Sequence, residues 1–356
     1  MARNKLIKFL QNTHDKFMSF LIYWGWEYRI KKRKLKRKYY PLTREQKKEI
    51  RSYWKRFGKR VSPDWAGYFC SFLGEYSKLV IPESLYYTQI QPYLNVQDMN
   101  GLADKNLANR IFTTKMPGVL ARKMNGEFFD GVYNKITINQ AMKIIVDHGE
   151  CFIKPSRNSS YGDGALVWKK EQKQEKLEKA LSSDHKDLII QEIVKQHNDL
   201  AKFHPNSLNT IRIVSLRINN KTVILNSILR MGKENSIVDN YSKGGYICNL
   251  YSNGYLFEKS TQITGVVLDR HPDTNEIFSG NQIPSFENVI SEVVKQHDIV
   301  PFFRLIAWDF AINREGDPVL IEANFPSGQI DLHQLNNPGL FGEYTDQVLT
   351  EVYGKK

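Results

Sequence analysis

The sequence predicts an α+β protein whose antiparallel sheets carry helices on their faces, preceded by a helical region. Two observations predict this fold class. The first hundred residues have the pattern of helices and show no alternation of strand and helix. After Pro205, long apolar runs are joined by short turns that contain Asn, Gly or Asp, which is typical of β-hairpins.

Positive charge is concentrated at the N-terminus. Residues 1–60 hold 20 Lys and Arg against four Asp and Glu, whereas the rest of the chain is nearly neutral. Residues 5–26 are apolar and aromatic, and the basic cluster 29–38 follows directly. The uncharged run 17–26 is about half as long as a bilayer span, and the segment does not resemble a cleaved signal.

An apolar segment beside a Lys/Arg cluster favours a helix that lies on an anionic membrane surface, with residues 5–38 as the contact. A helix packed on the protein's own core is one alternative, and a nucleic-acid-binding patch is another. No motif of a nucleic-acid-reading fold occurs, so nucleic acid is the least favoured partner.

The three cysteines, Cys70, Cys151 and Cys248, lie far apart and form no CxxC pair. This spacing argues against a disulfide framework and against a zinc site, and it fits a reducing compartment. We therefore expect a cytoplasmic protein, placed at the inner membrane face if the N-terminus binds lipid.

The helical elements follow from local signals. Thr43 and Gln46 form a capping-box pattern before a charged helix. We expect helices over residues 44–56, 63–80, 83–90, 103–112, 138–148 (closed by Gly149), 170–181, 286–297, and from 342 onward.

The strands are expected mainly as hairpins about turn residues such as Asn125-Gly126. The predicted strands are 119–122 with 127–129, 151–154 with 165–168, 188–194, 210–218 with 222–231, 246–250 with 255–258, and 303–313 with 318–324.

A lysine at the end of a predicted strand is followed at once by a flexible loop. Lys154 is followed by Pro155-Ser156 and then by the Ser- and Gly-containing loop 157–164. Lysine supplies a compact cation for phosphate oxygens, and the hydroxyl and N–H groups of such a loop can surround phosphates. The P-loop pattern GxxxxGK[ST] is absent, and a plain surface hairpin is the alternative.

The apolar strand 188–194 contains Gln191-Glu192 followed by Ile193-Val194. Its backbone groups would bind the edge of a purine, and the two apolar side chains would pack on its face. A plain core strand is the alternative.

Three side chains that carry oxygen atoms, Asp309, Glu322 and Asn324, fall on the two arms of the last hairpin. Alternation places Glu322 and Asn324 on one face, and pairing brings Asp309 within about 5 Å of them between Cβ atoms. Magnesium is usually held by one or two carboxylates together with substrate phosphates. We expect a Mg²⁺ site here; the alternative is a solvent-facing sheet edge, which the apolar flanks disfavour.

The order of these pieces resembles the ATP-grasp superfamily. Residues 151–164 look like the phosphate loop of D-alanine–D-alanine ligases, and residues 309–328 look like their metal-binding hairpin. The segments 207–212 (SLNTIR), 238–245 (VDNYSKGG) and 321–324 (IEAN) are most similar to the sugar-transfer-associated ATP-grasp family, found with polysaccharide and capsule biosynthesis. The resemblance covers roughly residues 100–335, while the helical first hundred residues replace the Rossmann-like domain usual in ATP-grasp enzymes.

The resemblance implies an ATP-grasp fold, in which two α+β subdomains clasp ATP. We expect four parts: a basic segment (1–40), a helical region (41–100), a small subdomain with the phosphate loop (101–195) and a large subdomain with the metal-binding hairpin (196–356).

The family's functional residues carry over to matching positions. The implied ATP-binding residues are Lys105, Lys154, Ser156, Ser159, Ser160, Gly162, Gly164, Gln191, Glu192, Ile193, Val194 and, for the ribose, Asp199. The implied ligands of one or two Mg²⁺ ions are Asp309, Glu322 and Asn324. Arg212, Lys154 and Arg230 are the implied catalytic residues, and for Arg212 the alternative is an ion pair with a carboxylate.

An acceptor pocket is implied by His204, Asn209, Asp239, Asn240, Gly244 and Gly245. For the last four of these residues the alternative is a simple turn, and for His204 it is a surface position.

These features together predict an ATP- and Mg²⁺-dependent ligase that joins a carboxylate to an amine or hydroxyl through an acyl phosphate, in cell-surface polysaccharide biosynthesis. The substrate would be a small molecule or a sugar-linked precursor. A kinase of a hydroxyl substrate on the same fold is one alternative. A nucleotide-binding, membrane-tethering protein without turnover is the other.

Overall fold

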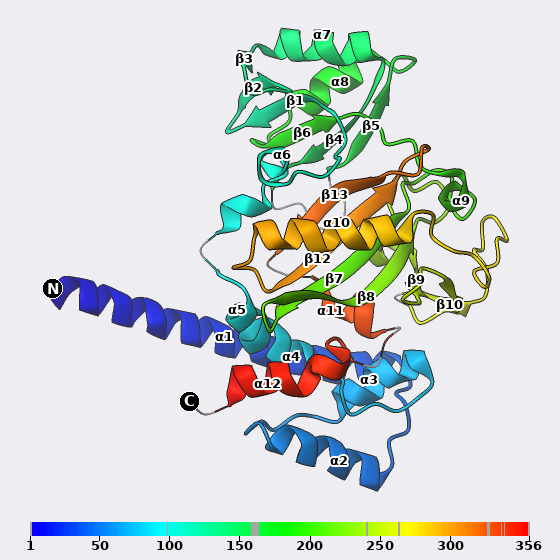
Figure 1. Ribbon diagram of the computed structural model, residues 1–356. Helices are drawn as coiled ribbons and strands as arrows, with labels where there is room; N and C mark the ends of the chain where they lie inside the picture. Colours follow the sequence, from blue (N-terminus) through cyan, green and yellow to red (C-terminus); the bar gives the residue numbers. More distant parts are fainter. Residues whose placement is uncertain are drawn as a thin grey trace. The chain divides into compact units, whose positions relative to one another are not determined.

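The computed structural model describes residues 2–97, 99–157, 164–239, 241–262, 264–325, 328–335, 337 and 339–354 (Figure 1). The chain forms two compact units, one of Met1–Gln97 with Pro326–Lys356 and one of Asp98–Phe325. Residues 326–356 therefore belong with the first helices, whereas sequence analysis grouped them with the preceding strands. The four-part division stays a prediction.

Within the residues that the structure describes, the regular elements of the first unit are all helices or helical turns. Its elements are α1 (Ala2–Lys36), α2 (Arg44–Lys55), α3 (Asp64–Leu73), α4 (Glu83–Leu85), the π-helical turn η1 (Tyr86–Ile90), α5 (Gln91–Leu94), α11 (Ile330–Gln334), the 3-10 turn η4 (Gly342–Tyr344) and α12 (Thr345–Tyr353). The capping box is confirmed, because Thr43 and Gln46 exchange both side chain–backbone hydrogen bonds. Helix α3 ends earlier than predicted because Gly74 adopts the left-handed conformation, with φ of 78°.

Two contacts fix the C-terminal segment within this unit. Gln334 accepts a hydrogen bond from the Ile81 N–H (2.7 Å) and donates one to the Ile81 carbonyl (2.9 Å). Asp346 accepts a hydrogen bond from the Tyr53 hydroxyl at 2.6 Å. Across the described residues of the whole chain, no helix combines the length and the apolar character that crossing a membrane requires.

The second unit contains a six-stranded antiparallel sheet, here called the small sheet. Its strands are β1 (Val119–Met124), β2 (Glu127–Asp130), β3 (Lys135–Ile136), β4 (Glu150–Pro155), β5 (Leu166–Lys169) and β6 (Leu188–Gln191), in the order β3-β2-β1-β6-β4-β5. Helices α7 (Ile138–His148) and α8 (Gln174–Leu181) cover one of its faces (Figure 1). Ile145 and Leu177 from these helices share a buried cluster with Ile153 and Trp168 from the sheet.

The same unit contains a seven-stranded antiparallel sheet, here called the large sheet. Its strands are β7 (Thr210–Ile218), β8 (Lys221–Met231), β9 (Tyr246–Leu250), β10 (Leu256–Gln262), β11 (Val267–Leu268), β12 (Leu305–Ile312) and β13 (Pro318–Asn324), in the order β11-β10-β9-β8-β7-β12-β13. Short connections contain α9 (Asn198–Ala201) and the 3-10 turn η3 (Tyr241–Lys243).

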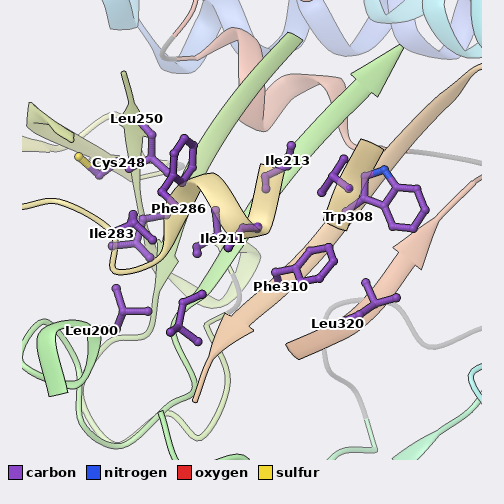
Figure 2. Close-up of a cluster of buried hydrophobic side chains, with 14 of the residues drawn as sticks. Leu200, Ile211, Ile213, Cys248, Leu250, Ile283, Phe286, Trp308, Phe310 and Leu320 are labelled. Carbon is purple, nitrogen blue, oxygen red and sulfur yellow. The ribbon is translucent and has the colours of Figure 1, made fainter. Parts of the chain in front are cut away.

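Helix α10 (Phe286–Ile299) covers one face of the large sheet (Figure 1). Figure 2 shows the cluster on that face, where Phe286 of the helix packs near Ile211 of β7 and Phe310 of β12. Because side chains alternate along a strand, the neighbouring residues Arg212 and Asp309 project from the opposite face. That opposite face carries the polar residues described below.

The predicted helix over residues 103–112 is interrupted. The structure has a 3-10 turn, η2 (Asn100–Ala103), then a non-helical turn, and then the short helix α6 (Ala108–Ile111). The interruption has a local cause, since the Asp104 carboxylate accepts a hydrogen bond from the Asn106 N–H at 2.9 Å. Side chains such as Asp compete in this way with the helical backbone pattern.

Candidate functional site

Four charged side chains form a connected row on the polar face of the large sheet. Arg212 on β7 makes two parallel hydrogen bonds to Asp309 on β12, Nε to Oδ1 and Nη2 to Oδ2, both at 2.7 Å. Arg230 on β8 donates to Asp309 Oδ2 (3.2 Å) and to Asp239 Oδ1 (3.0 Å). The side chains of all four residues are between 5% and 12% exposed. The ion pair of Arg212 with a carboxylate, which the sequence analysis gave as an alternative, is therefore present.

The two arginines decide the charge of Asp309. Burial by itself raises the pKa of this carboxyl, but the nearby Arg212 and Arg230 lower it to about 2. Arg212 responds in the opposite direction: burial lowers its pKa, and the Asp309 carboxylate raises it above the usual value. Asp309 is therefore ionised at physiological pH. Burial raises the pKa of Asp239, although Arg230 and Thr210 oppose that effect.

Glu322, next to this row, contacts a cation from outside the large sheet. It lies directly opposite Asp309 in the β12–β13 pairing, as predicted. Lys105 Nζ, from the segment before β1, lies 2.9 Å from Glu322 Oε1. Burial and repulsion from Lys105 lower the pKa of Lys154, on β4, to about 8, while attraction to Glu322 and Asp309 opposes this shift. Lys154 therefore lies within electrostatic range of the same two carboxylates.

The backbone around Lys105 is tied to the segment that follows Lys154. The Lys105 N–H donates to the Ser156 carbonyl at 3.1 Å, and the Ser156 N–H donates to the Asp187 carbonyl at 3.2 Å. The Ser156 hydroxyl is buried and has no hydrogen-bond partner among the described residues. A buried hydroxyl without a partner is costly, which fits a position that a bound group completes.

An apolar pocket adjoins the Lys105–Glu322 pair. It is lined by Leu102, Ala103, Asp104, Lys105, Ala108, Asn109, Phe112, Met116, Pro117, Val119, Ile189, Gln191, Ile321, Glu322, Ala323 and Phe325. The sheets contribute opposite sides, with Ile189 and Gln191 from β6 and Ile321 to Ala323 from β13. The walls are mainly apolar with charged groups at one end, but the volume of about 30 Å³ is far below the roughly 300 Å³ or more of a small-ligand pocket.

Sequence analysis missed Phe112, Met116 and Ile321 as pocket residues. Strict alternation places Ile321 on the face opposite Glu322. The structure instead has a β-bulge, because the register shifts between Asp309 and Phe310 and leaves Ile321 without a paired residue. A bulge opposes two residues to one and changes where side chains point, so Ile321 and Glu322 both line the pocket. No sequence signal marked this bulge.

The predicted purine segment reaches the pocket only in part. Gln191 is buried and lines it, whereas Ile193 and Val194 are partly buried and are not among its lining residues. Glu192 is exposed, and its N–H donates to the Gly118 carbonyl at 2.8 Å. A Cβ atom on Gly118 would lie 2.5 Å from the Glu192 carboxyl carbon, which is the end of a flexible, exposed side chain that can move aside.

The comparisons identify the family to which this arrangement belongs. Residues 86–348 match the family described as Sugar-transfer associated ATP-grasp. The chain belongs to the sugar-transfer-associated ATP-grasp family. The resemblance expected from the sequence is confirmed, together with the mixed helix-and-sheet fold class. No curated protein matches the sequence.

Solved structures similar to this ATP-grasp protein include D-alanyl-alanine synthetase A from Vibrio cholerae, at 12% identity and a TM-score of 0.43, covering 71% of this chain and 65% of that one. The VanG D-Ala:D-Ser ligase from Enterococcus faecalis has 15% identity and a TM-score of 0.44, covering 74% and 63%. The N5-carboxyaminoimidazole synthetase from Staphylococcus aureus, complexed with ADP, has 12% identity and a TM-score of 0.40, covering 71% and 51%. The matches thus span less than two thirds of these relatives' lengths.

The oxygen-bearing side chains of this ATP-grasp chain fit a divalent cation that is coordinated partly by the protein and partly by phosphate oxygens. Among the described residues, no group of three or more His, Cys, Asp and Glu side chains is placed to hold a metal. Asp309 Oδ1 accepts one hydrogen bond from Arg212, and Asn324 lies 3.4 Å from Asp309 Oδ2. A carboxylate oxygen has two lone pairs, so Oδ1 keeps acceptor capacity in a residue that lies opposite Glu322 in the β12–β13 pairing. Mg²⁺ is typically completed by phosphate oxygens at such a set.

Other predicted residues lie apart from this row. Among the implied acceptor residues, the Asn209 amide donates to the carbonyls of Leu200 (2.8 Å) and His204 (2.9 Å), so it braces a loop. His204 is buried rather than on the surface, with Nδ1 2.7 Å from the Ser207 hydroxyl. The Asp239 side chain does reach the row through Arg230.

Of the remaining predicted residues, four are described by the structure and four are not. Asp199 is exposed and lies 3.6 Å from His197, in a separate surface pocket with Lys202 and Ser285. Gly164 and Gly244 have positive φ of 77° and 95°, as turns require, and Gly245 directly precedes β9. Ser159, Ser160, Gly162 and Asn240 lie outside the described residues.

Proposed function

We propose that this chain is an ATP- and Mg²⁺-dependent ligase that joins a carboxylate to an amine or hydroxyl through an acyl phosphate. The observation that supports the proposal is the 2.9 Å contact of Lys105 Nζ with Glu322 Oε1, opposite Asp309 in the large sheet and within electrostatic range of Lys154 on the small sheet. Family membership supports ATP as the ligand.

In the proposed reaction, a carboxylate oxygen of the donor attacks the γ-phosphorus of ATP. The bond from that phosphorus to the oxygen of ADP breaks, and an acyl phosphate and ADP form. The amine or hydroxyl of the acceptor then attacks the acyl carbon. Phosphate leaves, the acceptor loses its proton, and an amide or ester remains.

The protein's part in phosphoryl transfer is mainly positioning and neutralisation of charge. Lys105 and Lys154 would hold phosphate oxygens, and the purine would enter at the pocket that Gln191 and Ile321 line, which must widen from about 30 Å³ to accept it. Arg212 makes two hydrogen bonds to Asp309, and its guanidinium would supply positive charge next to the transferring group. Asp309, Glu322 and Asn324 would hold Mg²⁺, which would supply further positive charge to the phosphates.

The family description connects the proposed ligase with sugar transfer. We therefore propose a sugar-linked or other small acceptor and a role in cell-surface polysaccharide biosynthesis. The three buried cysteines and the chemistry of ATP fit the reducing cytoplasmic compartment expected from the sequence.

The test is a panel of carboxylates and amines or sugar nucleotides, supplied with ATP and Mg²⁺, with ADP and phosphate both measured. The expected result is release of phosphate only when donor and acceptor are present together. Glu322→Gln and Lys154→Met should each lower turnover about a hundredfold or more, because each removes a charged group at the site of transfer.

Glu127→Gln is the matched control, since Glu127 forms an exposed ion pair with Lys135 at 2.6 Å. Such pairs contribute little, and turnover should be unchanged. ADP formation without phosphate release would favour the kinase instead. Full activity of both site variants would refute the proposed site.

A further inference from the structure

Helix α1 has one face that is anchored in the first unit. Ile30 on this face is fully buried. Arg33 Nη1 lies 2.9 Å from Glu83 Oε2, and the Trp65 indole N–H donates to Glu27 Oε1 at 2.8 Å. These contacts orient the helix about its own axis within that unit.

Toward its N-terminus, α1 carries five large apolar side chains that are exposed, of which Phe20 and Trp24 line an open surface pocket with Thr88 and Gln89. We call Phe17, Phe20, Leu21, Trp24 and Tyr28 the apolar stripe. They recur every three or four residues, so they lie along one side of the helix within an arc of about 100°. All five are exposed, Phe17 at 59% and Tyr28 at 65%. Soluble surfaces rarely leave so many adjacent aromatic side chains in water.

Four exposed lysines follow the stripe, three in the last turns of α1 and one, Lys38, just after its end. Lys31, Lys32, Lys36 and Lys38 are exposed, and we call them the free lysines because no ion pair within the described part of the chain includes them. The neighbouring basic residues differ: Arg33 pairs with Glu83, and Lys34 Nζ lies 2.7 Å from Asp64 Oδ1. The exposed positive charge is therefore separate from the charge that holds the fold together.

We propose that this face of α1 docks on an anionic lipid surface, with the apolar stripe at the acyl boundary and the free lysines among the headgroups. The juxtaposition is the one that interfacial helices use: an apolar side rich in Trp and Phe beside clustered Lys. Each Lys near an anionic surface adds attraction. The indole of Trp24 is apolar with one polar edge, which suits the interface.

Other occupants fit less well. A second copy packed in parallel would bring the free lysines of both helices close together, where like charges repel, and one packed antiparallel would leave the lysines without a partner. A nucleic acid would attract the free lysines, but it would leave the apolar stripe in water without a partner. A lipid surface satisfies both features at once, and it would hold the proposed ligase beside membrane-bound substrates.

The experiment is sedimentation of the full chain with vesicles of phosphatidylcholine alone and of phosphatidylcholine with phosphatidylserine. We expect at least tenfold stronger binding to the anionic vesicles, weakened by salt because the attraction is screened. Phe20→Gln with Trp24→Gln should weaken binding to the anionic vesicles about tenfold or more. Replacing all four free lysines with Gln should do the same.

Helix α2 supplies the matched control. Lys47, Lys48, Arg51 and Lys55 are equally exposed in the same unit, and their replacement with Gln removes the same charge. The control should bind vesicles nearly as well as the unchanged chain. The proposal would be overturned if all variants bound anionic vesicles equally well, or if the unchanged chain did not bind them at low salt. Tight binding to duplex DNA and not to vesicles would overturn it as well. The proposal would also be overturned if the Phe20→Gln, Trp24→Gln variant changed the chain from a dimer to a monomer and left vesicle binding unchanged.

Discussion

Asp309 is a buried carboxylate held between guanidinium groups from two neighbouring strands. Arg212 meets it at 2.7 Å through both oxygens, and Arg230 meets it at 3.2 Å. In such a cluster each charge offsets the desolvation of the others, so removing one member leaves the rest uncompensated.

Asp309→Asn should therefore lower the free energy of unfolding by about 3–5 kcal/mol, because two buried arginines lose their shared anion. Urea unfolding followed by circular dichroism measures this change. Asp317→Asn is the control, since Asp317 pairs with Lys115 on the exposed surface at 2.7 Å; it should cost less than about 1 kcal/mol. Equal, small costs for both variants would contradict the buried cluster.

His297 is a buried histidine whose hydrogen bonds fix its neutral form. The Phe303 carbonyl can only accept, so Nε2, at 2.8 Å, carries the proton. Nδ1 then accepts from the Ser215 hydroxyl at 2.7 Å, and that hydroxyl accepts from the Trp308 indole at 2.8 Å. Burial lowers the pKa of His297 from 6.5 to about 4, with a smaller effect from Arg217.

The unfolded chain binds more protons at this histidine than the folded chain between pH 6.5 and 4. Stability should therefore fall as the pH falls through that window, by about 2 kcal/mol between pH 7 and 4.5 from this group. His297→Gln should remove that part of the pH dependence in urea unfolding. The exposed His148→Gln should leave it unchanged. An unaltered pH slope in the His297 variant would show that the residue titrates normally.

The segment between η2 and α6 behaves as one rigid turn that presents Lys105. The Asn106 amide donates to the carbonyls of Lys123 (3.3 Å) and Leu188 (3.2 Å), and the Asn106 carbonyl accepts from Arg122 Nη1 at 2.8 Å. The turn is thereby hydrogen-bonded to both β1 and β6. Asn106 is a positioning residue for Lys105 in the proposed ligase.

Asn106→Ala should weaken the binding of ADP by about tenfold, because Lys105 loses its fixed position relative to Glu322. Titration calorimetry with ADP and Mg²⁺ measures this. The variant should also lose about 1–3 kcal/mol of stability, since two carbonyl groups lose a buried donor. Asn134→Ala is the control, because Asn134 braces an exposed turn through Asp130 at 2.9 Å. Loss of stability with unchanged ADP affinity would reduce Asn106 to a structural role.

At the scale of elements, the sequence predicted the hairpins well because their turns are encoded locally. Asn125-Gly126 and Asn219-Asn220 both adopt positive φ, which Asn and Gly tolerate, and the strands on either side pair as expected. The β-bulge at Ile321 was not predictable, because it depends on how β13 pairs with β12. The break after Ala103 was not predictable either, because the Asp104 side chain competes there with the helical backbone pattern. Pocket residues next to those features were missed for the same reason.

At the scale of the molecule, the sequence placed Asp309 and Glu322 together because one hairpin joins them. It did not show that Arg230 connects Asp309 with Asp239, since β8 reaches that face only through the register of several strands. The position of residues 326–356 was also hidden. Their apolar residues predict burial, but no local pattern tells which helices cover them.

That C-terminal segment completes the core of the first unit. Leu332, Phe341 and Leu349 within it are buried, and the Gln334 amide satisfies both backbone groups of Ile81. Residues 1–97 alone should therefore expose apolar surface and fail to form a protease-resistant unit, whereas residues 1–97 joined by a flexible linker to 326–356 should resist proteolysis.

Gln334→Ala in the full chain tests the same point without truncation. It should make the first unit more sensitive to limited proteolysis, because a buried N–H and carbonyl lose their partners at about 1–3 kcal/mol each. The exposed Gln282→Ala, outside this unit, serves as control, since Gln282 bonds only the exposed Asn253 carbonyl among the described contacts. If 1–97 alone were as resistant as the linked form, and Gln334→Ala had no effect, the first helices would hold their own core. The C-terminal segment would then lie on that unit's surface without supporting it.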